Sequence, residues 1–188
     1  MELKERQATQ PSLEEKAEEI HTIHVSFPPK PQKYEIKPEG TTSKILAYRA
    51  ARRANVYFGH IQENLNFEKL FKQEAEFEIL LSLLGLTCEI YIKSILYFQR
   101  EKSNCNYIKG HKLYDELYVK LSDDHKRLIE EKFKEQDASK DFSSELKKLN
   151  SLFEDFRYAY ELRGYTINLD SAKRIMQILH ETCNEIVR

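Results

Sequence analysis

The chain has 188 residues, of which 40% are apolar and 32% are charged, and this composition is typical of a folded domain rather than a disordered one. Its 30 Lys and Arg residues and 31 Asp and Glu residues give a formal net charge of −1. That balance excludes a strong overall attraction to nucleic acid or anionic membranes, but it permits a local basic patch. The three cysteines, at positions 88, 105 and 183, form no CxxC pair, so neither a zinc site nor a disulfide framework is expected.

Two segments bear on location. The first ten residues, MELKERQATQ, are charged and lack the apolar core of a signal peptide. The most apolar run, ILLSLLGLTC at 79–88, has about half of the ~20 residues that a membrane span needs. We therefore expect a reduced, cytoplasmic protein with no membrane segment, whose most apolar run forms a buried core helix.

Residues 1–43 are predicted to form an N-terminal appendage. An amphipathic helix is expected in SLEEKAEEIHTI, residues 12–23, and an extended, Pro-rich connector over 24–43. The remaining residues, 44–188, are predicted to form one helical domain.

Two long helices are expected at the start of this domain. The first begins at Thr42 or Ser43 and carries an apolar stripe made of Ile45, Leu46, Tyr48, Val56 and Ile61. The second spans 67–100 and is apolar nearly all round from Phe77 to Phe98, as a central helix should be.

The second half of the domain is predicted to contain further helices. A short one at about 111–121 places Leu113, Leu117 and Leu121 in one row, and the next is capped by Ser122 and carries Ile129 and Phe133. One continuous amphipathic helix is then expected over 142–162, ended by Gly164. Asp170 is expected to cap the last helix, whose apolar side contains Ile175, Ile178, Leu179 and Ile186. The pattern predicts an all-α bundle.

Polar residues interrupt the apolar surfaces of two of these helices. Glu89 and Lys93 are four residues apart within the central helix, one turn after Gly85, whose missing side chain can admit a neighbouring helix. Because a buried charge is costly unless paired, Glu89 is expected either to pair with Lys93 or to orient Arg157 across a seam between two helices. Arg157 also lies one turn before Glu161, with which a surface ion pair is the simpler alternative.

The histidines give weaker signals. His21 and His24 are three residues apart but have no evident third ligand, so no metal site is expected. His111 follows Gly110 at a helix start, where a structural capping role is the simpler interpretation.

Three segments in this order resemble the HEPN superfamily, the helical domains named for higher eukaryotes and prokaryotes nucleotide-binding. They are LLSLLGLTCEIYIKSILYFQR with Glu89 and Lys93, GHKLYDELYVKL with Gly110 and His111, and FEDFRYAYE with Arg157, Tyr158 and Glu161. The resemblance covers about residues 70–165. It implies an up-and-down four-helix core, commonly paired into a homodimer and often found in prokaryotic toxin or defence proteins, with an antitoxin or a nucleotidyltransferase as possible partner.

Active members of that superfamily look like metal-independent ribonucleases with an R-x(4–6)-H motif, in which a histidine moves protons and an arginine stabilises phosphorane charge. This chain departs from the motif, because no histidine follows Arg157 at that offset. The spacing occurs instead from Arg53 to His60 and from Arg174 to His180.

Three hypotheses follow. In the first, the chain binds RNA or a partner protein but is catalytically degenerate, with Arg157 binding phosphate or stabilising the fold. In the second, it is an active metal-independent ribonuclease that uses Arg157 with His111 or His180. In the third, it is a helical interaction module unrelated to nucleic acid. The polar residues Glu89, Lys93, Arg157, Tyr158 and Glu161 are candidates for binding or for a structural seam in all three, and no cofactor is expected.

Overall fold

The computed structural model describes residues 42–64, 74–100, 106–157 and 166–187, and every regular element in these ranges is helical. The all-α prediction is therefore confirmed for the described residues. The α-helices are α1 (Ser43–Asn64), α3 (Glu74–Phe98), α4 (Asp123–Gln136), α5 (Phe142–Lys148), α6 (Leu152–Arg157) and α7 (Leu169–Ile186). A π-helical turn, η2 (Leu113–Leu117), and a 3-10 turn, η3 (Tyr118–Lys120), precede α4. The expected appendage at 1–43, including His21 and His24, lies almost wholly outside the described residues.

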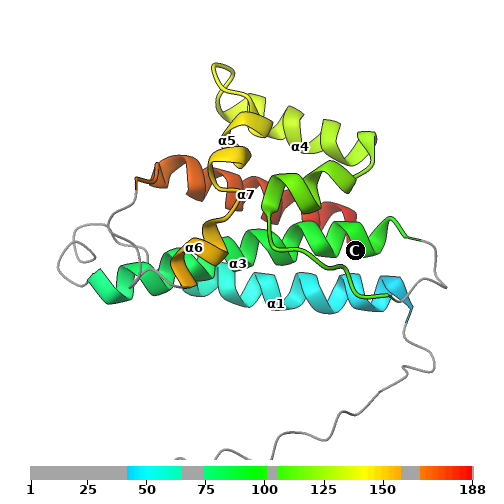
Figure 1. Cartoon of the computed structure of the whole chain (residues 1–188). Helices are drawn as coiled ribbons and strands as arrows, with labels where there is room; N and C mark the ends of the chain where they lie inside the picture. Colours follow the sequence, from blue (N-terminus) through cyan, green and yellow to red (C-terminus); the bar gives the residue numbers. More distant parts are fainter. Residues whose placement is uncertain (1–41, 65–73, 101–105, 158–165, 188) are drawn as a thin grey trace, which may run out of the picture. The chain divides into compact units, whose positions relative to one another are not determined.

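Helix α3 is the centre of the domain and packs against α1, α6 and α7 (Figure 1). The Ser94 hydroxyl near its end donates to the carbonyl oxygen of Ala47 near the start of α1, at 2.7 Å, so α1 and α3 are antiparallel. Helix α4 packs on α7, also antiparallel, because Lys132 pairs with Glu185 at 3.0 Å while Asp137 after α4 contacts Arg174 early in α7.

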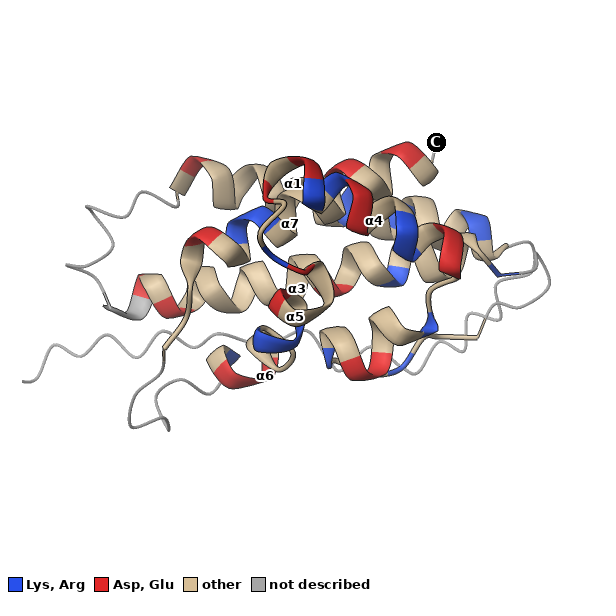
Figure 2. Cartoon of the chain, turned by 90° about the horizontal axis from the view of Figure 1, so that it is seen from above, with Lys and Arg blue, Asp and Glu red and all other residues tan. Residues whose placement is uncertain are grey.

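Along its middle, α3 carries almost no charge, whereas cationic and acidic residues are interspersed on the other helices (Figure 2). By length and composition, Glu76–Phe98 is the one described helix that would be able to cross a membrane, but 67% of its most apolar window is buried within the fold. Cys88 on this helix and Cys183 on α7 are buried free thiols, and burial raises the pKa of Cys88 to about 12.

The buried face of α1 differs from the prediction. Ala47, Ala51 and Ala54 are buried together with Ile61, whereas Tyr48 and Val56 are exposed, Val56 by 70%. Leu46 is half-buried and Ile45 is exposed. Small alanine side chains let α1 approach α3 closely, as the hydrogen bond between Ser94 and the α1 backbone also shows. The close approach of the two helices therefore decides which face of α1 is buried, and the apolar pattern alone predicts the wrong face.

The continuous helix predicted over 142–162 is wrong, because a turn at 149–151 divides it into α5 and α6. The side-chain oxygen of Asn150 accepts hydrogen bonds from the backbone N–H groups of Tyr114 and Asp115, and its amide donates to the Asp115 carboxylate. Its carbonyl oxygen accepts from the Leu113 N–H at 2.9 Å. These contacts with η2 replace the hydrogen bonds that a continuing helix would make.

The apolar positions in this region are nonetheless buried as predicted. Phe142, Leu146, Leu149, Leu152 and Phe156 are all in the core, as are Leu113, Leu117 and Leu121. The expected close approach at Gly85 is also confirmed, since a Cβ atom built on this glycine would lie 2.6 Å from the backbone nitrogen of Phe153 on α6.

The predicted cap of α4 is confirmed, because Ser122 accepts from the backbone N–H of His125. The cap of α7 is misplaced by two residues: Asn168, not Asp170, accepts from the Ser171 N–H. Ile175, Ile178 and Leu179 are buried on α7 as expected.

Candidate functional site

Glu89 is a buried carboxylate with two partners. Its Oε1 atom accepts from the Lys93 ammonium at 2.7 Å, which is the internal pair expected from the sequence. Its Oε2 atom lies 3.0 Å from Nδ1 of His111, a residue brought in from the loop after α3. The side chain of His111 is half-exposed, and its ring lies beside Phe153 of α6. Glu89 therefore joins a lysine and a histidine, and the structure gives it these partners rather than Arg157.

The loop that carries His111 has a defined conformation. Gly110 adopts φ +110°, a region that L side chains rarely occupy. The Glu116 carboxylate accepts from the backbone N–H groups of Lys112 and His111, and these hydrogen bonds lower its pKa. The capping role expected for His111 is not observed, because the N-cap of η2 is Lys112 and the imidazole contacts Glu89.

A groove of about 480 Å³ lies between α1 and α3, and Glu89 and Lys93 form part of its wall. Arg49 and Arg53 project into it from α1, while Tyr97 and Tyr107 line it from α3 and the following loop. Its apolar wall contains Leu46, Ala50, Leu86 and Ile90. In the described part of the chain, neither arginine makes an ion pair or a side-chain hydrogen bond. We call this space the α1–α3 groove.

A second groove, also of about 480 Å³, is lined by Tyr107 as well. Among the residues that the structure describes, three cations line it, Arg100, Lys109 and Lys120, and no carboxylate does. We call it the loop groove. Since Tyr107 lines both spaces, the two grooves are neighbours.

Arg157 occupies a different place. It is exposed at the end of α6 and lines a smaller groove of about 310 Å³ with Ile79, Ser82, Leu83, Leu86 and Phe156. Tyr158 and Glu161 lie outside the described residues. The structure thus brings together Glu89, Lys93 and His111, and it places Arg157 in another groove, which shares only Leu86 with the described lining of the α1–α3 groove.

His180 belongs to a polar cluster between α1, α3 and α7. The Tyr91 hydroxyl lies 2.7 Å from its Nδ1 atom and 2.8 Å from the side-chain oxygen of Asn55, and Asn184 contacts the imidazole as well. The ring stacks on Phe58 with 4.0 Å between centroids, and burial lowers the pKa of His180. These contacts indicate that His180 stabilises the packing of α7 against α1 and α3.

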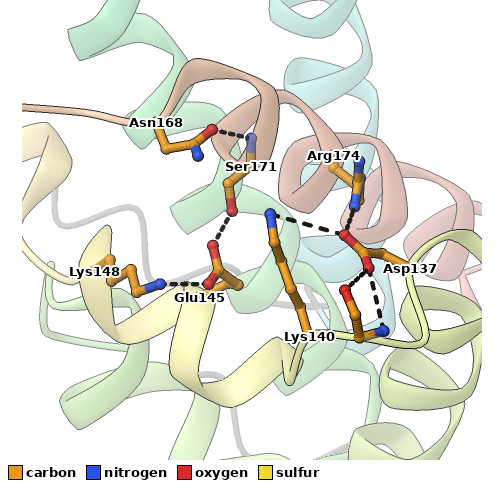
Figure 3. A network of polar contacts seen from close by, with 8 residues as sticks. Asp137, Lys140, Glu145, Lys148, Asn168, Ser171 and Arg174 are labelled. Carbon is orange, nitrogen blue, oxygen red and sulfur yellow. Dashed lines mark hydrogen bonds and ion pairs between the residues drawn. The ribbon is translucent and has the colours of Figure 1, made fainter.

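Arg174, the residue that would complete the R-x(4–6)-H spacing with His180, points elsewhere. Its guanidinium contacts the Asp137 carboxylate, which also pairs with Lys140, in the network that joins α4, α5 and α7 (Figure 3). Nearby, the Ser171 hydroxyl donates to the Glu145 carboxylate. Residues six apart on a helix differ in direction by about 120°, which accounts for the separation of Arg174 and His180. The alternative spacing, Arg53 to His60, also gives no pair: Arg53 lines the α1–α3 groove, and His60 contacts Asn64.

Arg49 and Tyr107 were not identified from the sequence, and Arg53 was identified only for its spacing to His60. A usable signal existed for the arginines, because positions 46, 49, 50 and 53 share one side of a helix and alternate apolar with basic residues. For Tyr107 no such signal exists, since its position depends on how the loop crosses α3.

Comparisons with protein-family models, with curated proteins and with solved structures found no match to this chain.

Proposed function

We propose that this chain is a HEPN-like helical protein that binds RNA through the α1–α3 groove. The observation that carries the proposal is the gathering of Arg49, Arg53 and Lys93 in one groove with two tyrosines, where neither arginine has an ion pair or side-chain hydrogen bond within the described residues. Cationic side chains without internal partners bind phosphates, and tyrosine rings stack on bases. The one carboxylate among the described lining residues, that of Glu89, is already paired with Lys93 and His111.

The helix order supports the HEPN-like assignment. Helices α1 and α3 are antiparallel, as are α4 and α7, and the expected ExxxK pair of Glu89 and Lys93 lies in the central helix. An up-and-down core of α1, α3, α4 and α7 has these directions. We assign the chain to the toxin or defence setting of that superfamily, as a cytoplasmic protein with an antitoxin or a nucleotidyltransferase as partner.

RNA binding is tested by fluorescence polarisation of a labelled oligoribonucleotide at low salt. Arg53→Ala should weaken binding and reduce the salt dependence by about one phosphate contact, a slope change of about 0.7 for a single strand. Arg52→Ala is the matched control, because Arg52 neighbours Arg53 but lies over the Tyr48 ring and does not line the groove. Absence of RNA binding by the unsubstituted protein refutes the proposal and favours the interaction module.

A second candidate function is metal-independent RNA cleavage, and the contact between Glu89 and His111 favours it. A carboxylate beside Nδ1 favours the tautomer with its proton on that atom, so that Nε2 can accept the proton of a ribose 2′-hydroxyl. The 2′-oxygen would then attack the adjacent phosphorus, and the 5′-oxygen would leave with a proton, giving a cyclic phosphate and a 5′-hydroxyl. Lys93 and the groove arginines would stabilise the phosphorane.

Cleavage of a labelled RNA in EDTA separates the two candidates. Binding without cleavage supports the first. Cleavage that His111→Ala abolishes supports the second. Cleavage that persists in His111→Ala but is lost in Arg157→Ala would instead place the active site in the groove beside α6.

We also propose that the protein is a homodimer. Ile79 on α3 and Val56 on α1 are large apolar side chains exposed by 66% and 70%, and exposed apolar patches are common at self-association surfaces. Light scattering at tens of micromolar should give twice the 22.4 kDa of one chain, and a mass of one chain would contradict the dimer.

A further inference from the structure

We propose that the α1–α3 groove and the loop groove form one continuous site for a single-stranded nucleic acid, with a base stacked on Tyr107 between them. This inference rests on the proposed RNA binding and adds the strandedness of the ligand and the extent of the site.

Charge is the first argument. The described lining of the two grooves contains one carboxylate, that of Glu89, and six cations, namely Arg49, Arg53, Lys93, Arg100, Lys109 and Lys120. The whole chain, by contrast, has a net charge of −1. Such local segregation of positive charge matches a polyanion that continues past Tyr107 rather than one isolated phosphate group.

The second argument is the exposure of Tyr107. This side chain is 78% exposed, more than any other large apolar or aromatic residue in the described part of the chain. It lines both grooves, so an aromatic face stands where a strand passing from one groove to the other would cross. An aromatic ring in a basic channel is the usual stacking platform for an unpaired base.

The third argument is that the backbone around Tyr107 is held in place. On one side, the Arg100 guanidinium donates to the carbonyl oxygen of Asn106 at 2.6 Å. On the other, the backbone N–H of the buried Ile108 donates to the Tyr97 hydroxyl at 3.0 Å. The exposed ring therefore stands on an anchored segment, and stacking a base on it requires little further ordering of the loop.

The exposed position of the Tyr107 ring also predicts that the nucleic acid is single-stranded. In a duplex both faces of each internal base are covered by neighbouring base pairs, so a protruding tyrosine finds no free face. A single strand offers an unstacked base to the ring while its phosphates contact the cations on either side. A partner protein with an acidic segment is the alternative ligand for these cations, and the test below excludes or supports it.

The experiment measures polarisation of a labelled oligouridine of about 12 nucleotides, within the range of known single-strand site sizes, and of a hairpin duplex of similar length. We expect the single strand to bind more tightly than the duplex. Tyr107→Ala should weaken single-strand binding about ten- to a hundredfold and leave duplex binding nearly unchanged, whereas Tyr107→Phe should retain the preference. Tyr48→Ala is the matched control, because Tyr48 is an exposed tyrosine that lines neither groove.

The extent of the site is tested with Lys120→Ala in the loop groove and Arg53→Ala in the α1–α3 groove. If the site is continuous, each substitution weakens binding of the oligouridine and lowers its salt dependence. RNA binding that responds to Arg53→Ala but not to Lys120→Ala or Tyr107→Ala overturns the continuous site and leaves the proposed function intact. Equal affinity for strand and duplex overturns the single-strand inference, and no binding of either refutes both proposals and favours an acidic protein partner.

Discussion

Gly85→Ala is the sharpest test of how α6 packs on α3. The added Cβ atom would lie 2.6 Å from the backbone nitrogen of Phe153 and 3.0 Å from its Cα atom, where ordinary contact begins at 3.4 Å. Both are backbone atoms, so the clash cannot be relieved by rotating a side chain and α6 must move. Overpacking of this kind costs about 1–3 kcal/mol, and alanine in place of glycine within a helix returns about 1 kcal/mol.

We therefore expect Gly85→Ala to lower the free energy of unfolding by up to about 2 kcal/mol, the difference between these two effects. For a urea m-value of about 2 kcal/mol/M, the midpoint falls by up to about 1 M. Gly59→Ala is the matched control, because Gly59 also lies within a helix and nothing comes within 4 Å of its added Cβ atom. Gly59→Ala should raise the midpoint. Urea unfolding followed by circular dichroism measures both, and a rise for Gly85→Ala equal to that for Gly59→Ala would refute the close packing of α6.

Three further changes test other contacts. Glu89→Ala should lower the free energy of unfolding by about 2 kcal/mol and couple to Lys93→Ala in a double-mutant cycle, whereas strong coupling to Arg157→Ala would contradict the observed pairing. Asn150→Ala removes the side-chain hydrogen bonds to η2 and should cost about 1–3 kcal/mol in urea unfolding, and no loss would contradict the tie between η2 and the α5–α6 turn. Because burial lowers the pKa of His180 in the fold, the unfolded chain binds this proton first as the pH falls below about 6.5, so stability should decrease there. His180→Gln should flatten that decrease in thermal unfolding between neutral and mildly acidic pH, and parallel profiles would rule the histidine out as its source.

Local sequence rules succeeded where the deciding contact is local. Glu89 and Lys93 were paired from their spacing of four residues, and Ser122 was identified as a cap from its position before a helix. Both depend on atoms within one turn of the chain.

Non-local contacts account for the failures. The apolar spacing from Leu149 to Phe156 continues unchanged through the break between α5 and α6, so periodicity alone cannot locate the turn that the contacts of Asn150 with η2 impose. The partnership of His111 with Glu89 depends on the course of the loop after α3, and the basic character of the two grooves depends on three segments of the chain meeting. Neither is encoded in a single stretch of sequence.

The alanine face of α1 affects how this chain can diverge. Ala47 and Ala54 are fully buried where α1 approaches α3, so their positions admit only small residues. Arg49 and Arg53 lie on the same helix but face open space, and their replacement removes no buried contact. Two adjacent sets of positions on one helix are therefore under different selective constraints. Substitutions at the groove positions therefore need no compensating change elsewhere in the fold, whereas larger residues at the alanine positions would force α1 away from α3.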